Sequence, residues 1–418
     1  MVELGGCMRP EILGLILAGG RGTRLEPLTS FRSKPAVPFG GRYRIIDFVL
    51  SNFINSGIYS IYVLTQFKSQ SLTEHINEAW RFGSLLPNQY ITCVPAQMNT
   101  GDSWYMGTAD AIYQNINLIR HENPFLTAVF GGDHIYKMDV SAMAKYHHEK
   151  SADCTVAALA VPLEEATEFG VIQVDSDWRI IGFQEKPANP ISLPNDPTKA
   201  LVSMGNYIFN TRQLINELEE DAVNENSSHD FGKDILPKMK GSGRLYAYDF
   251  GRNTIPGEPL GLNSYWRDVG TLDAYYEANM DLRYVNPAFN LYNKEWPIHS
   301  NTMRLPPAKF VHLGPHRTGQ AINSVVCEGV IISGAVVKDS IVGPNVRINS
   351  FSQVDGCIIM EGVEIGRNCK IRNAIIDKHV KISEGSEIGY DSDKDRENYE
   401  TVTENGLVVI KKARRFLM

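Results

Sequence analysis

The chain has 418 residues, of which 43% are hydrophobic and 21% charged, as in ordinary globular proteins, and it is too long for a single core. A net charge of −7 from 41 basic and 48 acidic residues argues against general binding of nucleic acid, which relies on a basic surface. The six cysteines show neither a metal-ligand spacing nor a disulfide framework, and the N-terminal segment predicts no signal peptide or membrane span. A cytoplasmic location is therefore expected.

The N-terminal part alternates apolar strands with amphipathic helices. Residues 12–18 form an almost wholly apolar run that enters a glycine loop, Gly19-Gly20-Arg21-Gly22. Further strands are expected at 61–65, 127–130 and 154–161, with helices at 47–55 and 109–120. This alternation predicts a Rossmann-like, three-layer α/β domain with a parallel sheet. Because ligands bind beyond the carboxyl ends of such strands, the glycine loop and Gly131-Gly132-Asp133 should share one crevice.

The pattern changes after residue 170. Segments 171–174, 179–185 and 204–209 read as strands of a lobe that covers the crevice, the usual place for a second substrate. Four prolines between residues 285 and 310 indicate a linker. The sequence thus predicts a first domain at 1–284, a linker at 285–310, and a last domain with a C-terminal tail at 311–418.

The last domain carries a repeat of twelve Val or Ile residues spaced 6, 6 and 5 apart, which recurs every 17 residues. The positions are Val325, Ile331, Val337, Val342, Ile348, Val354, Ile359, Ile365, Ile371, Ile376, Ile382 and Ile388. The alternative is an ordinary sheet of period two, in which any Val-rich stretch scores matches. The fixed register instead favours a three-sided prism of short parallel strands, a left-handed β-helix of the hexapeptide type.

The glycine loop is suited to phosphate, because residues without Cβ let backbone N–H groups approach an anion. It lacks the patterns of a P-loop and of a dinucleotide-binding loop, so taken alone it is equally compatible with a tight turn. Lys34 follows Arg24 by ten residues, with Pro27 between them. The chain could therefore fold back and bring this lysine to the same anion.

Taken together, the segment from Leu17 to Arg24 and the Lys34-Pro35 pair resemble the signature of the sugar nucleotidyltransferases. Other segments match that family in order over residues 13–270, and a family β-helix follows. They include Gly40–Asp47, Pro95–Gln97, Trp104–Ala111, Gly132–Lys137, Glu185–Pro187, Ser203–Gly205, His229–Asp234 and Tyr265–Gly270. The resemblance is strongest to the bacterial branch that makes ADP-glucose and pyrophosphate from ATP and glucose 1-phosphate with Mg²⁺, the first committed step of glycogen synthesis. It implies a GT-A-like catalytic domain.

The resemblance also implies roles for individual residues. Arg24 and Lys34 would grip the triphosphate and the leaving pyrophosphate, and Asp133 and Asp268 would hold Mg²⁺, a cation that prefers carboxylate and phosphate oxygens. The implied catalytic residues are Arg24, Lys34, Asp133 and Lys186. The implied glucose 1-phosphate site is Tyr105, Gly170, Glu185, Lys186 and Ser203. The implied nucleotide site is Leu17, Ala18, Gly19, Gly20, Gln97, Gly107 and Asp133. His134 is expected to be a hydrogen-bonded structural histidine, because the nucleophile is already an anion and needs no general base.

The resemblance predicts that the enzyme is regulated and forms an assembly, but it does not identify the effector. An anionic allosteric effector would use cations such as Arg32, Arg44 and the run from Lys411 to Arg415, although that run reads equally as a solvated tail. Phe31 and Pro38 stand where some relatives carry a basic residue and a histidine, which argues against control by fructose 1,6-bisphosphate and AMP. Relatives are homotetramers, so a homotetramer is expected.

Three other functions compete with this interpretation. An enzyme of the same fold could make UDP-, dTDP- or GDP-sugars, and the base pocket near Gln97 would decide between them. A non-catalytic regulatory subunit could keep both domains, although the intact motifs argue against it. An acyltransferase could use the β-helix, but only His379 lies within the repeat and no acyl-carrier motif accompanies it.

Overall fold

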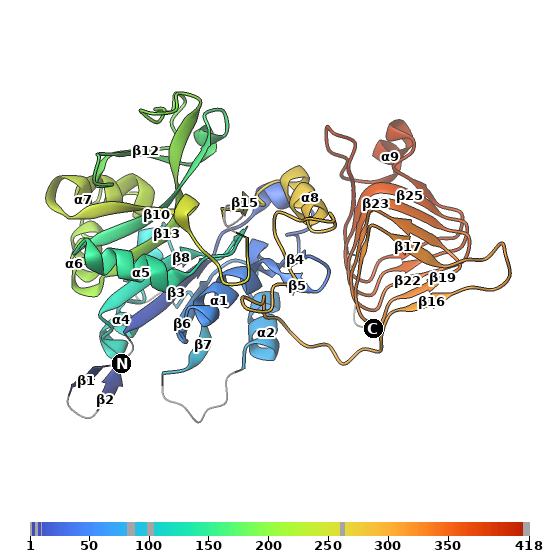
Figure 1. Cartoon of the computed structure of the whole chain (residues 1–418), viewed down its shortest axis with the longest axis horizontal. Helices are drawn as coiled ribbons and strands as arrows, with labels where there is room; N and C mark the ends of the chain where they lie inside the picture. Colours follow the sequence, from blue (N-terminus) through green and yellow to red (C-terminus); the bar gives the residue numbers. More distant parts are fainter. Residues whose placement is uncertain are drawn as a thin grey trace.

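Two bodies make up the chain, an α/β domain and a prism of short strands, which lie side by side in Figure 1. The computed structural model describes residues 2–4, 7–9, 11–81, 88–97, 104–259 and 264–412. The two bodies correspond to the predicted α/β domain and β-helix. The predicted residue limits of these domains stay predictions.

A nine-stranded sheet forms the centre of the α/β domain. The strand order is β12-β11-β13-β8-β3-β6-β7, while β10 pairs with β13 and β14. The strands are β3 (Ile12–Ala18), β6 (Ser60–Thr65), β7 (Tyr90–Pro95), β8 (Leu126–Gly131), β10 (Cys154–Pro162), β11 (Gly170–Val174), β12 (Ile180–Glu185), β13 (Lys199–Asn210) and β14 (Leu245–Asp249). Short antiparallel pairs join β1 (Val2–Leu4) with β2 (Cys7–Arg9), β4 (Pro38–Phe39) with β5 (Tyr43–Arg44), and β9 (His134–Tyr136) with β15 (Trp266–Asp268).

The prediction of a parallel sheet is right only for part of it. Strands β8, β3, β6 and β7 are parallel neighbours, but β13 runs antiparallel to β8, β10 and β11. β13 is twelve residues long, so it serves both the sheet and the β11–β12 lobe. The sequence pattern at 204–209 captured only its second half. The sheet is therefore mixed.

Helices flank the sheet of this domain. They are α1 (Ile45–Asn55), α2 (Gln70–Ala79), α3 (Thr108–Tyr113), α4 (Ile116–Glu122), α5 (Val140–Glu149), α6 (Thr211–Ala222), α7 (Leu236–Ser242) and α8 (Leu272–Asp281). The single helix predicted at 109–120 is two helices, because Asn115 leaves the helical conformation and donates from its side chain to Ala111 O at 2.8 Å. No helix in the described segments has the length and apolar character needed to cross a membrane.

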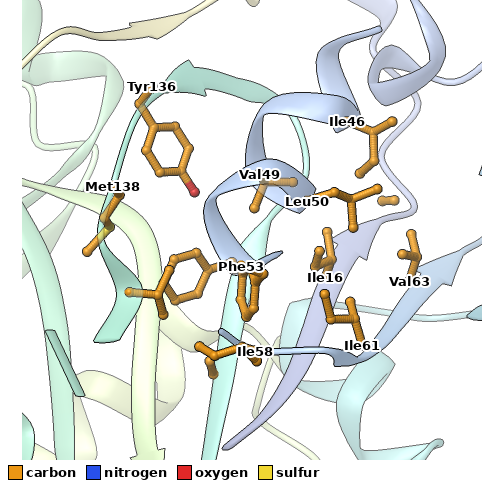
Figure 2. Packing of buried hydrophobic residues seen from close by; sticks show 14 of the residues in the cluster. Ile16, Ile46, Val49, Leu50, Phe53, Ile58, Ile61, Val63, Tyr136 and Met138 are labelled. Atoms are coloured by element: carbon orange, nitrogen blue, oxygen red, sulfur yellow. The ribbon is translucent and has the colours of Figure 1, made fainter. Parts of the chain in front are cut away.

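The core beneath the sheet explains why α1 is so strongly apolar. Figure 2 shows Ile46, Val49, Leu50 and Phe53 of α1 facing Ile16, Ile61 and Val63 from β3 and β6. Phe53 packs edge-on to Phe130, with ring centroids 4.9 Å apart. A Cβ on Gly14 would lie only 2.8 Å from the Phe53 ring, so the glycine in the predicted strand lets this ring pack directly on β3.

The C-terminal body is a stack of parallel strands. It contains β16 (Lys309–Val311), β17 (Gln320–Ile322), β18 (Val325–Val326), β19 (Ile331–Ser333), β20 (Val336–Lys338), β21 (Ile341–Val342), β22 (Arg347–Ile348), β23 (Gln353–Ile359), β24 (Glu364–Ile365), β25 (Lys370–Ile376), β26 (Lys381–Ile382), β27 (Glu387–Ile388) and β28 (Val408–Ile410), with α9 (Ser392–Asn398) before the last strand. Val337, Val354 and Ile371 stack in register on one side. Their side chains are buried in a single apolar column, as a left-handed β-helix requires.

The predicted repeat is wrong at its first two positions. Val325 pairs with Ile341 and Ile331 pairs with Arg347, so the inward residues of the first coil are Val326 and Ile332. Val326 and its partner Val342 are 16 positions apart, whereas Val337 and Val354 are 17 apart. This first coil of the repeat, from Val326 to Val342, is one residue shorter than the coils that follow it, and the doublets Val325-Val326 and Ile331-Ile332 place an apolar side chain inward all the same.

The outward side chains of one prism face bind the α/β domain. Ile341, Ile358 and Ile375 precede the inward residues of their strands and share an apolar cluster with Tyr275 of α8 and Phe39 of β4. Figure 1 shows α8 facing this side of the prism. A buried ion pair lies in the same interface, where Arg32 Nη2 donates to both carboxylate oxygens of Asp377 at 2.7 and 2.6 Å.

The segment between α8 and β16 has no helix or strand but is fixed to the α/β domain. Ser300 Oγ donates to Asp47 Oδ2 at 2.7 Å, and Asn55 Nδ2 donates to Pro297 O at 2.9 Å. Trp296 is buried. The proline-rich linker is therefore packed against the α/β domain at residues 296–300.

The Arg32–Asp377 pair generates a test of the interface. Asp377→Ala leaves the Arg32 guanidinium buried without its counter-ion, so the free energy of unfolding should fall by about 3 kcal/mol. Urea denaturation followed by circular dichroism measures the change. Glu387→Ala, which removes an exposed partner of Lys370, should change stability by no more than about 0.5 kcal/mol. Equal effects of the two substitutions would contradict the role assigned to the buried pair.

Candidate active site

A cleft of about 680 Å³ opens at the carboxyl ends of β3 and β8. Leu17 of β3 pairs with Gly131 of β8, so the glycine loop after β3 and Asp133 after β8 line the same cleft, as predicted from their places at the carboxyl ends of strands. Its described lining residues include Leu17, Ala18, Gly19, Gly20, Arg21, Arg24, Lys34, Gln66, Tyr105, Gly107, Thr108, Asp133, His134, Glu185, Gly205, Tyr207, Asp230, Gly232 and Gly270.

Lys34 occupies the electrostatic centre of the cleft. Its Nζ donates to Asp133 Oδ2 at 3.0 Å and to Asp268 Oδ1 at 2.7 Å, and the residue is only 7% exposed. Burial lowers the pKa of Lys34, but the two carboxylates outweigh it, so its pKa lies above the usual value. Burial likewise raises the pKa of Asp133, and the Lys34 ammonium reverses this, so that pKa lies well below the usual range.

The two aspartates come together through β9 and β15. Asp268 pairs with His134 in the antiparallel ladder, which places it beside Asp133 despite the long separation in sequence. Ligand atoms of Asp133, His134 and Asp268 lie within 4.8 Å of one another. Two carboxylates at this distance suit a hard divalent cation, so the donor set fits the predicted metal site.

His134 differs from its prediction. Its Nε2 lies 3.6 Å from Asp133 Oδ1 and 3.8 Å from Asp268 Oδ1, too far for hydrogen bonds, and its buried Nδ1 has no partner among the described residues. The ring packs edge-on to Trp266 with centroids 5.0 Å apart. The side chain of His134 is thus held by an aromatic contact rather than by hydrogen bonds.

Arg24 reaches across the mouth of the cleft. Its Nη1 donates to Glu168 Oε2 at 3.1 Å, while Nη2 lies 3.9 Å from Asp268 Oδ2. The side chain is 56% exposed, so it is accessible to a ligand. A Cβ on Gly270 would lie 3.1 Å from Arg24 Nη2 and 3.0 Å from Asp268, which explains why this position has no side chain.

A side chain is excluded at Gly22 of the glycine loop and at Gly132, which follows β8. Gly22 has φ +63°, and a Cβ there would lie 3.0 Å from Lys34 Cβ, so the left-handed turn also brings the loop against Lys34. A Cβ on Gly132 would lie 2.9 Å from Ile46. Gly20, in contrast, faces open space. The glycine loop is therefore closely packed against Lys34 on one side, while its backbone at Gly20 is open to the cleft on the other.

Only some of the residues predicted to bind the sugar phosphate line the cleft. Glu185 lies at the end of β12 and pairs with Gly170. Burial raises the pKa of Glu185, and the nearby Asp230 carboxylate raises it further. Tyr105 lines the cleft, with its hydroxyl accepting from Asn115 Nδ2 at 2.9 Å. Ser203 is buried behind Gly205 and accepts from that residue's N–H at 3.2 Å.

Four predicted substrate-binding residues are not among those that line the cleft: Gly170, Ser203, Lys186 and Gln97. Lys186 follows β12 at φ +44° and is exposed at the edge of the lobe. Gln97 is exposed after β7 and adjoins residues 98–103, which lie outside the described part of the chain. Neither position excludes a ligand contact, and the roles of both stay predictions.

Sequence reasoning missed several residues in the cleft. Gln66 follows β6 and accepts from the Tyr105 N–H at 2.9 Å. Asp230 Oδ2 accepts from Thr108 Oγ1 at 2.9 Å, and Gly232 lies against Glu185. The segment from His229 to Asp234 matches the family pattern, but nothing in its composition shows that it folds under α3.

The predicted effector cations lie elsewhere, between the two bodies. A pocket of about 260 Å³ is lined by Phe31, Arg32, Ala36, Arg44, Gln70, Ser71, Glu74, Lys378, His379 and Lys412. Arg32 is committed to Asp377, and Arg44 Nη1 donates to Ser71 O at 2.7 Å. Burial lowers the pKa of both Arg44 and Lys378, and the proximity of the two cations lowers that of Lys378 further. Lys411 pairs with Glu400, and residues 413–415 lie outside the described residues.

Comparisons with known proteins agree with this geometry. A family model described as nucleotidyl transferase matches residues 13–284, and one described as GlmU-like, C-terminal hexapeptide matches residues 306–410. A glucose-1-phosphate adenylyltransferase from Thermus thermophilus is 57% identical over 98% of this chain and 100% of its own length. Proteins of the same name from an Anaeromyxobacter species and Deinococcus deserti are 54% and 52% identical over 97% and 98% of this chain, and over 99% and 100% of their own lengths.

Domain order, the cleft at the carboxyl ends of β3 and β8, and similarity along nearly the whole length all point to the same family. Because the nucleotidyl transferase match covers more than half of the chain and the relatives exceed 50% identity, the chain belongs to the nucleotidyl transferase family and, within it, to the glucose-1-phosphate adenylyltransferases.

Proposed function

We propose that the chain catalyses the formation of ADP-glucose and pyrophosphate from ATP and glucose 1-phosphate in the cleft around Lys34. The observation that carries the proposal is the buried Lys34 ammonium between Asp133 and Asp268, beside an open glycine loop. A phosphate oxygen of glucose 1-phosphate attacks the α-phosphorus of ATP, a new P–O bond forms, and the bond to pyrophosphate breaks. The attacking oxygen is already anionic, so the site must position anions and balance charge.

The residues of the cleft divide this work. The backbone of Leu17, Ala18, Gly19 and Gly20 would receive the nucleotide, with Gln97 and Gly107 nearer the base. Arg24 is exposed at the mouth and would bind the triphosphate and the departing pyrophosphate. Glu185 would accept hydrogen bonds from sugar hydroxyls, and Lys186 would reach the sugar phosphate from the lobe edge. Tyr105, Gly170 and Ser203 would shape the sugar pocket.

Asp133 and Asp268 would hold Mg²⁺. Carboxylate oxygens are the ligands this cation prefers, and Asp268 pairs in the β9–β15 ladder with His134, the residue after Asp133. When bound, the cation would neutralise charge on the phosphate oxygens of ATP. Lys34, within hydrogen-bond distance of both carboxylates, would hold them in place and present its charge to the same phosphates.

A substrate matrix tests the proposed reaction. Purified protein with Mg²⁺ should release pyrophosphate from ATP and glucose 1-phosphate, and at equal concentrations UTP, dTTP and GTP should react more slowly. Release of pyrophosphate measures the rate, and mass spectrometry identifies ADP-glucose. A preference for UTP, dTTP or GTP would instead indicate the alternative sugar nucleotides, and no pyrophosphate from any pair would refute the assignment.

Substitution of the metal-binding carboxylate tests the catalytic centre. Asp133→Ala should lower kcat by about 100-fold or more, because it removes a metal ligand and one of the two partners of Lys34. Circular dichroism checks that the fold is kept. Asp177→Ala, which removes an exposed carboxylate on the far loop paired with Lys150, should leave kcat near that of the unmodified protein. An intact kcat in Asp133→Ala would rule out the proposed metal site.

The pocket between the two bodies is the proposed site for an anionic effector. Arg44 and Lys378 are both half-buried there, and burial together with the charge of Arg44 lowers the pKa of Lys378, so an anion between the two cations would relieve their repulsion. Arg32 lines the same pocket, and its pair with Asp377 would hold its positive charge there. The location joins the α/β domain to the β-helix, and a homotetramer stays a further prediction.

Inorganic phosphate is a simple probe of this pocket. At saturating substrates, phosphate should change the rate of the unmodified protein, and Lys378→Gln should reduce that response by about tenfold in apparent affinity, since a charged hydrogen bond is lost. Lys381→Gln, at an 82% exposed lysine side chain of β26, provides the control and should respond normally. An unchanged response in Lys378→Gln would contradict the proposed effector site.

A further inference from the structure

His229 has an unusual backbone for a residue beside the cleft. Its φ is +55°, in the left-handed region that residues with a Cβ seldom adopt. The ring is fastened to α6, with Nδ1 2.7 Å from Asp221 Oδ2, and both side chains are largely buried. Ser227 Oγ donates to the other oxygen of Asp221 at 2.6 Å and accepts from the His229 N–H at 2.9 Å. This network holds the backbone of His229 in its uncommon conformation.

The strained backbone directs the His229 carbonyl to the start of α3. That oxygen accepts from Ala109 N at 2.8 Å and from Asp110 N at 3.3 Å. A Cβ on Gly107 would lie 2.2 Å from the same oxygen, so the contact is possible only because Gly107 has no side chain. The position of Gly107, on the proposed nucleotide side of the cleft, is therefore fixed by His229.

The residues after His229 form the opposite wall. Asp230 and Gly232 line the cleft, and a Cβ on Gly232 would lie 2.7 Å from Glu185 Oε2. Thr108 Oγ1 donates to Asp230 at 2.9 Å and accepts from Phe231 N at 3.0 Å. The proposed sugar side is thus hydrogen-bonded to the residue next to Gly107. One loop sets the spacing between the two halves of the cleft.

We propose that His229, held by Asp221, is a positioning residue for both substrates at once. It lies outside the lining of the cleft and acts through Gly107 towards the nucleotide and through Asp230 and Gly232 towards the sugar phosphate. The proposal rests on the proposed function for the identity of the substrates. Its signature is that loss of the imidazole moves the affinities for ATP and for glucose 1-phosphate together.

Four variants separate this role from a general effect on folding. His229→Ala removes the ring and keeps a strained backbone, so the KM values for ATP and for glucose 1-phosphate should each rise about tenfold, with a smaller change in kcat. His229→Asn should stay within about twofold of the unmodified protein, because asparagine tolerates the left-handed region and its amide can donate to Asp221. Lys186→Gln should raise only the KM for glucose 1-phosphate. His148→Ala, at an exposed histidine of α5, should change neither.

Binding measured by isothermal titration calorimetry keeps the test independent of turnover. The Kd values of ATP and of glucose 1-phosphate should both rise in His229→Ala and recover in His229→Asn. The proposal is overturned if only one of the two constants moves, if both keep their normal values while the melting temperature falls, or if His229→Asn behaves like His229→Ala. An unmodified protein that binds both ligands but releases no pyrophosphate would refute the proposed function alone, while the binding constants of the variants would still decide the role of His229.

Discussion

The ammonium of Lys34 lies between the carboxylates of Asp133 and Asp268, and the geometry of the cleft depends on this contact. Each of the three groups is partly or wholly withdrawn from water, where an unpaired charge is costly. Three segments that are distant in sequence must therefore meet: the turn after the glycine loop, the end of β8 and the β9–β15 ladder. The same contact explains the left-handed Gly22, which brings the loop onto Lys34, and the bare Gly270 beside Asp268.

The position of Lys34 also ties the cleft to the second body. Arg32 is two residues away and is held by Asp377 of the β-helix in a buried pair. The short helical turn of Lys34, Pro35 and Ala36 is buried along its whole length. A change in how the β-helix holds Arg32 would consequently be felt at Lys34 through very few bonds. Arg32 and Arg44 both line the proposed effector pocket. The short turn from Arg32 to Lys34 therefore connects this pocket to the charged centre of the cleft.

Much of this structure could be predicted from periodicity and from the family resemblance, and the failures have physical causes. The apolar run at 12–18 and the spacing of Val and Ile residues identified β3 and the prism because burial imposes those patterns directly. The antiparallel direction of β13 could not be read, since a buried strand has the same composition in either direction. Asp230 and Gly232 were missed for a similar reason: their place in the cleft depends on how His229 docks under α3, a tertiary contact without a local signal. Gln97 and Lys186 were assigned by resemblance alone, and neither is among the residues that line the cleft.

The doublets along the prism explain how the first coil can be one residue short. On the face that meets the α/β domain, each strand must be apolar on both sides, because one neighbour enters the column and the other, such as Ile341, Ile358 or Ile375, enters the interface. Val325-Val326 follows the same rule. Both residues of such a doublet are apolar, so either one can face the interior. The loss of one residue therefore turns the neighbouring apolar side chain inward instead of a polar one. The interface therefore makes its own face of the prism tolerant of small insertions and deletions that a single-sided strand would not survive.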